Sequence, residues 1–168
     1  MDETEQLQAK ITEMVRAFGL HRPETTPCGQ PITVSEAHAL MEVSCGWALF
    51  REEGDAAEHL GTCSAAHQPK ELCRRLRLDK STVSRILKRL EERGWINRTP
   101  DPADGRAIHL ALTEAGQQAL DELEGARATK YSEVLASIPS DERDAVLRAL
   151  DVLAGAMRDA DRAAELEV

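Results

Sequence analysis

The sequence predicts a mainly α-helical protein that contains one small β-hairpin. Ala and Leu are abundant, whereas the aromatic residues that favour strands make up only 3% of the 168 residues. In several stretches the apolar residues recur at three- and four-residue steps, which is the spacing of one helix face. One stretch instead places two short apolar runs on either side of a dense turn, as a hairpin does.

The first two helices are expected on either side of a loop. The first helix covers residues 3–18 and stops at Gly19. Residues 21–31 contain three prolines and a glycine and are expected to form the loop. Thr33 then caps a second helix, because Glu36 follows it in capping-box spacing. The apolar stripe of the first helix consists of Leu7, Ile11, Met14, Val15 and Phe18.

Two short helices come after residues 44–66, which are expected to be mostly loop. Pro69 suits the first position of the earlier helix. Asp79 can cap the later one, residues 80–93, which Gly94 ends.

A hairpin and two long helices complete the expected elements. The strands are residues 95–98 and 107–112, joined by the turn-forming sequence TPDPADG. Thr113 begins a long helix that Pro139 breaks, and a last helix follows. The apolar stripe of the last helix consists of Val146, Leu147, Leu150, Leu153 and Met157.

Helix, turn, helix, hairpin and helix in this order form a winged helix-turn-helix with residues 80–93 as its recognition helix. Short hydroxyl side chains near the start of that helix and longer cations further along suit a reader of the major groove. A solvated, charged helix face is the alternative interpretation. The polar face consists of Ser81, Thr82, Ser84, Arg85, Lys88 and Arg89.

The charge distribution supports a DNA contact despite the net charge of −9. Residues 70–106 hold 11 Lys and Arg and 6 Asp and Glu, a net charge of +5, whereas the rest holds 10 and 24, a net charge of −14. Arg106 in the hairpin tip can enter a minor groove, and Asp104 can orient its guanidinium. An ordinary solvated turn is the alternative. Lys70 and Arg98 are further candidate DNA contacts.

These residues resemble the MarR family of bacterial transcription regulators. The similar segment is LDKSTVSRILKRLEERGWINRTPDPADGRAIHLALTEAG, with the acidic-Arg wing at Asp104-Gly105-Arg106 and a Leu-Thr-x-x-Gly helix start at residues 112–116. PKELCRRLRL resembles the preceding helix, with Cys73 where the family usually has a smaller residue, and ITVSEAHALMEV resembles the helix before it. The resemblance covers residues 32–43 and 67–116.

The resemblance implies a homodimer, held by its terminal helices, that binds double-stranded DNA at a near-palindromic site, typically as a repressor. It implies three segments: a dimerisation helix and loop at 1–31, a DNA-binding domain at 32–116 with an insertion at about 44–66, and dimerisation helices at 117–168. A small molecule, a metal or an oxidant would modulate DNA affinity. The alternative is a winged helix used only for protein–protein contact.

An enzyme, a membrane protein and a secreted protein are all disfavoured. The sequence contains no nucleophile–base–orienter set and no glycine-rich phosphate loop. No apolar run approaches the roughly 18 residues of a membrane helix, and the acidic N-terminus is unlike a signal peptide. We therefore expect a cytoplasmic protein, in which the four cysteines are thiols or ligands rather than disulfides.

The insertion departs from the family and contains candidate zinc ligands. With its margins it holds Cys45, His59, Cys63 and His67, of which the last three lie four residues apart and would share one helix face. The alternative is an irregular loop with solvated His and half-buried Cys side chains.

A second candidate set is Cys28, Glu36 and His38, which loosely resembles the zinc-sensing branch of the family. That branch also places histidines on the helix after the wing, where this chain has none, and His109 on the strand is the nearest. Cys28 is alternatively an oxidant-sensing thiol, although its neighbours supply no positive charge. Cys73 is expected to be a small core residue.

Overall fold

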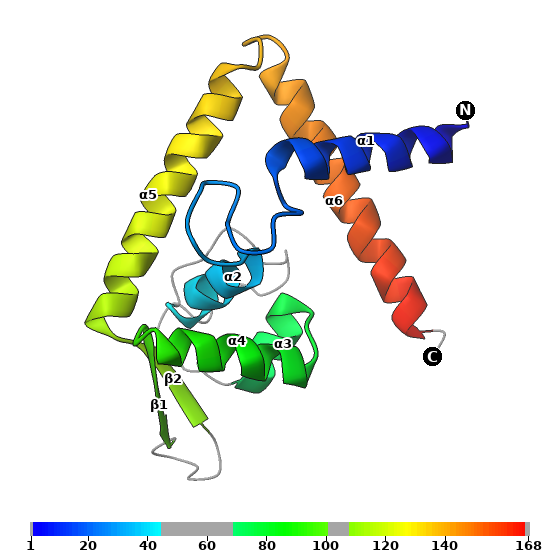
Figure 1. The fold of residues 1–168 in the computed structure, drawn as a ribbon. Helices are drawn as coiled ribbons and strands as arrows, with labels where there is room; N and C mark the ends of the chain where they lie inside the picture. The colour runs from blue at the N-terminus through cyan, green and yellow to red at the C-terminus, as the bar shows by residue number, and fades with distance from the viewer. Residues whose placement is uncertain (1, 45–68, 101–107, 167–168) are drawn as a thin grey trace, which may run out of the picture. The chain divides into compact units, whose positions relative to one another are not determined.

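The computed structural model describes residues 2–44, 69–100 and 108–166, and it confirms the predicted fold class (Figure 1). In the described ranges none of the helices is long and apolar enough to cross a membrane. The chain divides into two compact units, Met1–Arg127 and Ala128–Val168. In chain order the elements are α1 (Glu3–Phe18), α2 (Val34–Val43), α3 (Pro69–Leu76), α4 (Lys80–Glu92), β1 (Ile96–Pro100), β2 (Ile108–Leu112), α5 (Glu114–Ala136) and α6 (Arg143–Leu166).

The starts of α1 and α2 follow from local capping. Thr33 and Glu36 form the capping box predicted for α2, with the Glu36 backbone N–H donating to Thr33 Oγ1 at 3.1 Å. Asp2 and Glu5 form a similar box at α1, which ends at Gly19 with a φ of 84°, a conformation that favours glycine. The N-terminal unit thus begins with two helices whose ends are fixed by sequence-local contacts.

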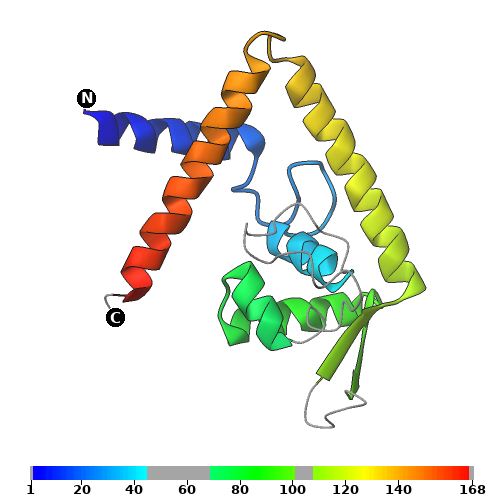
Figure 2. The ribbon, with the colours of Figure 1, turned by 180° about the vertical axis from the view of Figure 1, so that it is seen from behind.

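The core of the N-terminal unit lies among α2, α3, α4 and the hairpin, which Figures 1 and 2 show gathered together. Leu40 of α2, Leu72 of α3 and Leu110 of β2 are fully buried there. The predicted inward face of α4 is confirmed, since its buried residues are Val83, Ile86, Leu87 and Leu90. Each such side chain contributes about 1.5–3 kcal/mol on burial, and this orients the opposite face of α4 outward.

The hairpin is antiparallel, with Ile96 opposite Leu112 and Pro100 opposite Ile108. Its first strand begins at Ile96, one residue later than predicted, and ends at Pro100, two residues later than predicted. The Trp95 carbonyl accepts the Thr113 N–H at 3.0 Å, in continuation of this pairing. The hairpin tip, residues 101–107, lies outside the described residues.

The start of α5 is held against the turn between α4 and the hairpin. Thr113 Oγ1 donates to the Gly94 carbonyl at 2.6 Å and accepts the Gly116 N–H at 2.9 Å. A Cβ at Gly116 would lie 1.9 Å from the Trp95 carbonyl oxygen, so only glycine fits there. This contact explains physically the Leu-Thr-x-x-Gly pattern seen in the sequence.

The C-terminal unit contains the last part of α5 and the whole of α6. The predicted start of the last helix near residue 140 is corrected to Arg143, because Pro139 to Glu142 form a turn in which the Glu142 N–H donates to the Pro139 carbonyl at 3.0 Å. The apolar stripe of α6 is largely exposed in this single chain: Leu147 is 54% and Leu150 45% exposed, whereas Val146 and Leu153 are half-buried.

Candidate nucleic-acid interface

The polar face of α4 is exposed, as the sequence predicts. Ser81, Ser84, Arg85, Lys88 and Arg89 are all exposed, and Thr82 is half-buried. The core on the other side of α4 fixes this orientation, so the five exposed side chains are available to a partner. Their contact with DNA stays a prediction.

A polar cluster occupies the first turn of α4. Asp79 Oδ1 accepts hydrogen bonds from Ser81 Oγ at 2.5 Å and from the Thr82 backbone N–H at 3.0 Å. Asp79 Oδ2 accepts one from Thr82 Oγ1 at 2.6 Å. The hydrogen bond from Ser81, followed by those from Thr82, holds the pKa of Asp79 well below its usual range. Asp79 is therefore a stably ionised cap, a role that the sequence predicted only in part.

Arg85 lies back along the helix toward this cluster. Its Nη2 donates to Thr82 Oγ1 at 3.2 Å, and its Nε donates to the Ser81 carbonyl at 3.4 Å. Both bonds are exposed, so the guanidinium is held loosely over the first turn of α4 with further N–H groups to donate.

Arg89 and Glu36, assigned from sequence to two different sites, contact each other. Arg89 Nη1 lies 3.4 Å from Glu36 Oε1, and Glu36 Oε2 accepts the Thr33 N–H at 2.9 Å. Glu36 is only 2% exposed, whereas the Arg89 side chain is 60% exposed. Glu36 therefore both caps α2 and joins α2 to α4.

Two other predicted DNA contacts have acidic neighbours on α4. Arg98 Nε lies 3.0 Å from Glu91 Oε2 in an ion pair whose geometry is not that of a hydrogen bond, and its side chain is 25% exposed. Lys88 Nζ lies 3.7 Å from Glu92 Oε1 in an exposed pair. Pairs as exposed as that of Lys88 contribute little, so its cation remains available to phosphate.

Of the remaining predicted DNA residues, one is described by the structure and two are not. Lys70 is exposed in the first turn of α3. Asp104 and Arg106 fall in the hairpin tip, outside the described residues.

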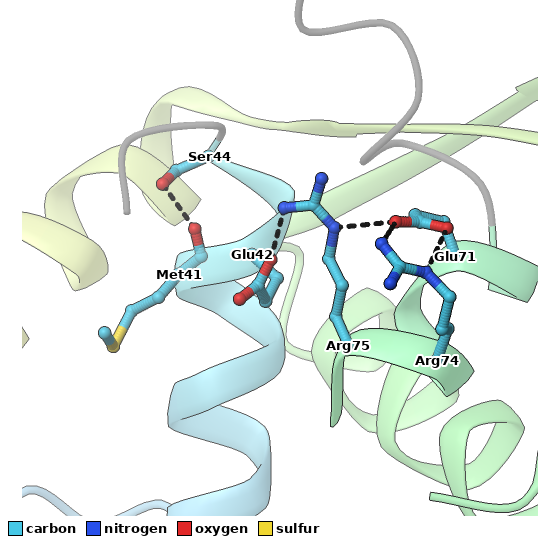
Figure 3. Close-up of polar contacts among 6 residues, drawn as sticks. All are labelled: Met41, Glu42, Ser44, Glu71, Arg74 and Arg75. Atoms are coloured by element: carbon cyan, nitrogen blue, oxygen red, sulfur yellow. Dashed lines mark hydrogen bonds and ion pairs between the residues drawn. The ribbon is translucent and has the colours of Figure 1, made fainter. Parts of the chain in front are cut away.

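An ion-pair network that the sequence did not predict joins α2 to α3 (Figure 3). Arg75 Nη1 donates to Glu42 Oε2 at 3.1 Å, and Arg75 Nε donates to Glu71 Oε1 at 2.9 Å. Arg74 Nη2 donates to Glu71 Oε1 at 2.6 Å. The hydrogen bond from Arg74, with that from Arg75 and against the opposing effect of partial burial, lowers the pKa of Glu71. The spacing of Glu71 and Arg75 was a visible signal of a helix pair, whereas the Glu42 contact is long-range.

The structure does not bring the second metal candidates together. Cys28 Sγ lies 3.1 Å from Thr26 Oγ1, and Glu36 is engaged as described. Burial, with the nearby charge of Arg127, lowers the pKa of His38. Among the residues described, no three His, Cys, Asp or Glu side chains form a group that could hold a metal ion. Cys73 is half-buried and packs against the core, as predicted.

The candidate zinc ligands of the insertion lie outside the part of the chain that the structure describes. Cys45, His59, Cys63 and His67 all lie outside the described residues, so a zinc site there stays a prediction.

Comparisons with known proteins agree with this geometry. The sequence model described as "MarR family" matches residues 57–107. The transcriptional repressor MprA of Escherichia coli K12 is 34% identical over 77 residues, which are 46% of this chain and 44% of MprA. The chain spans between 38% and 62% of the curated relatives it matches. These relatives are regulators of transcription, in agreement with the expectation that the chain is not an enzyme.

Two solved structures are similar over most of the chain and show the fold. Streptococcus pneumoniae FabT in complex with DNA has a TM-score of 0.64 and 17% identity, and the match covers 94% of this chain and 96% of FabT. Bordetella bronchiseptica BpsR, whose DNA binding is regulated by 6-hydroxynicotinic acid, has a TM-score of 0.57 and 18% identity, with 91% and 93% covered. The predicted resemblance to the MarR family is thus confirmed, and the solved structures share the fold of this chain.

Proposed function

We propose that this protein is a homodimeric transcription regulator, acting as a repressor, that reads a near-palindromic DNA site with α4. The observation that carries the proposal is the exposed polar face of α4, backed by an apolar face that is buried in the core. The similarity to MprA, a named transcriptional repressor, and to FabT, solved with DNA, supports it. Such a protein would act in the cytoplasm, where bacterial DNA lies.

Charge supports the same function. Residues 70–106 carry a net charge of +5 in a chain whose total is −9, so phosphate is attracted to this segment and repelled elsewhere. In the described part of that segment, Lys70, Lys80, Arg85 and Lys88 are exposed. Neutralising phosphates with these cations would give binding that weakens steeply with salt.

Dimerisation is proposed to use α1 and α6. No residue of α1 is buried, and Leu7 and Met14 on its stripe are exposed, as are Leu147 and Leu150 on that of α6. Apolar stripes of this length are covered by another surface in stable soluble proteins. A two-fold dimer would then place two copies of α4 on successive turns of the same DNA face.

The effector is proposed to be a small molecule, as for BpsR with 6-hydroxynicotinic acid. A metal held by the insertion through Cys45, His59, Cys63 and His67 is the second candidate, because the sequence gathers two of four cysteines and two of five histidines there. Metal analysis of purified protein, before and after chelation, separates the two: a metal-free protein whose DNA binding ignores added zinc leaves the small molecule.

A selection from a pool of random DNA duplexes tests the function. We expect the protein to enrich one near-palindromic sequence and to bind it about 10³-fold or more tightly than a scrambled duplex. Arg85→Ala should lower this ratio, whereas Lys88→Ala should weaken binding to both duplexes about equally. Absence of any enriched sequence would favour the alternative function, a winged helix that contacts only proteins.

A further inference from the structure

The hydroxyl groups in the first turn of α4 have a fixed hydrogen-bonding direction. Ser81 Oγ and Thr82 Oγ1 each lie within 2.6 Å of a different oxygen of Asp79. An ionised carboxylate only accepts hydrogen bonds, so both hydroxyls must be the donors. The separate bond from the Thr82 backbone N–H is enough to cap the helix. The two hydroxyl bonds are therefore additional to what capping needs.

A hydroxyl has one proton and two lone pairs, so these two side chains can only accept further hydrogen bonds. Thr82 Oγ1 already accepts from Arg85 Nη2 at 3.2 Å. Ser81 is exposed, and its lone pairs are directed by the bond to Asp79. Phosphate oxygens also only accept hydrogen bonds. Neither hydroxyl can therefore bind the DNA backbone while it donates its own proton to the Asp79 carboxylate.

We propose that Asp79 is a positioning residue that makes the first turn of α4 a reader of bases rather than of phosphates. It turns Ser81 into an acceptor, and through Thr82 it holds the Arg85 guanidinium as a donor beside it. In the major groove the donors are the amino groups of adenine and cytosine, and guanine offers two acceptors to Arg. The turn thus reads an amino-bearing base with Ser81 next to a guanine with Arg85. This inference rests on the proposed DNA-binding function.

Charge alone predicts the opposite effect of Asp79, which makes the inference testable. A carboxylate close to DNA repels phosphate, so its removal should tighten binding to every sequence. Asn caps helices as well as Asp does, so Asp79→Asn leaves the helix start in place. However, the amide oxygen that caps the helix also keeps the bond from Ser81, so the amide N–H group faces Thr82 Oγ1. The Thr82 hydroxyl must then turn its proton away from the amide, which disturbs its bond from the Arg85 guanidinium.

The test compares a duplex selected by the wild-type protein with a scrambled duplex. For Asp79→Asn we expect unchanged or tighter binding to the scrambled duplex and about tenfold weaker binding to the selected one. Glu92→Gln is the matched control, because it removes the same charge from an exposed site on the same helix and should leave the ratio unchanged. A ratio for Asp79→Asn within twofold of wild type overturns the proposal.

Base analogues locate the contact. Each adenine or cytosine of the selected duplex is replaced, one at a time, by an analogue without the exocyclic amino group. At the position that Ser81 reads, the wild type should lose about tenfold in affinity and Ser81→Ala should lose nothing further. Equal losses for both proteins at every position overturn the acceptor role of Ser81. Failure of the wild type to enrich any sequence would instead refute the DNA-binding function itself.

Discussion

Helices α4 and α6 carry similar apolar stripes but bury them to different extents. In α4 the stripe is buried against α2, α3 and the hairpin. In α6, which is longer at 24 residues, Leu147 and Leu150 are largely exposed in the single chain. The part of the chain around α4 therefore buries its apolar face within its own unit, whereas Leu147 and Leu150 of α6 are left exposed among the described residues.

Gly116→Ala should have the largest effect, because it damages the part that folds on its own contacts. The new methyl group would overlap the Trp95 carbonyl, which is backbone and cannot rotate away. We expect a loss of at least about 3 kcal/mol in the free energy of unfolding, measured with urea. Gly125→Ala on the same helix is the control, since its Cβ meets nothing, and it should be neutral or stabilise by up to about 1 kcal/mol. Equal stability of the two variants would contradict the close contact at Trp95.

Leu150→Glu tests whether the exposed stripe of α6 is covered in a dimer. A charge within the proposed dimer seam should cost at least about 2 kcal/mol of dimer stability, seen as monomer by light scattering together with lost operator binding. Unfolding of the core around α4 should change little. Val152→Glu is the control, because Val152 is 73% exposed and lies off the stripe. A Leu150→Glu protein that stays a dimer would place the seam elsewhere.

How much the sequence predicted depends on the range of the contact. The inward face of α4 and the capping box at Thr33 follow from periodicity and local spacing, and both are confirmed. The Arg89–Glu36 and Arg75–Glu42 pairs join residues 53 and 33 positions apart. Periodicity indicates which side chains are exposed but not which distant side chain they meet, so Arg89 and Glu36 were assigned to separate sites.

Arg89→Ala has a smaller expected effect than either of the first two. It leaves the buried Glu36 without its guanidinium partner, which should cost about 1–2 kcal/mol of unfolding free energy. Lys88→Ala removes a neighbouring cation from an exposed pair and should cost at most about 0.5 kcal/mol. Thermal unfolding of both variants gives the comparison, and equal losses would mean that burial of Glu36 adds nothing to the pair.

The smallest effect concerns pH. The pKa of Glu71 is lowered in the folded state, so its contribution to stability is present above the unfolded value near 4.5 and is lost as the pH falls through the folded pKa. Glu71→Gln should therefore flatten the dependence of stability on pH below about 4.5, by less than about 1 kcal/mol because the network is partly exposed. An unchanged slope would show that Arg74 and Arg75 do not stabilise the carboxylate.

The two ion pairs on α2 have a mechanical consequence. Glu36, near the start of α2, holds Arg89 of α4, and Glu42, near its end, holds Arg75 of α3. Helices α3 and α4 are thus each joined to α2 by an ion pair at a different point, in addition to their contact with each other. A displacement of α2 by the loop that precedes it would act on both ion pairs at once. Helices α3 and α4 would then move together with α2 rather than relative to each other.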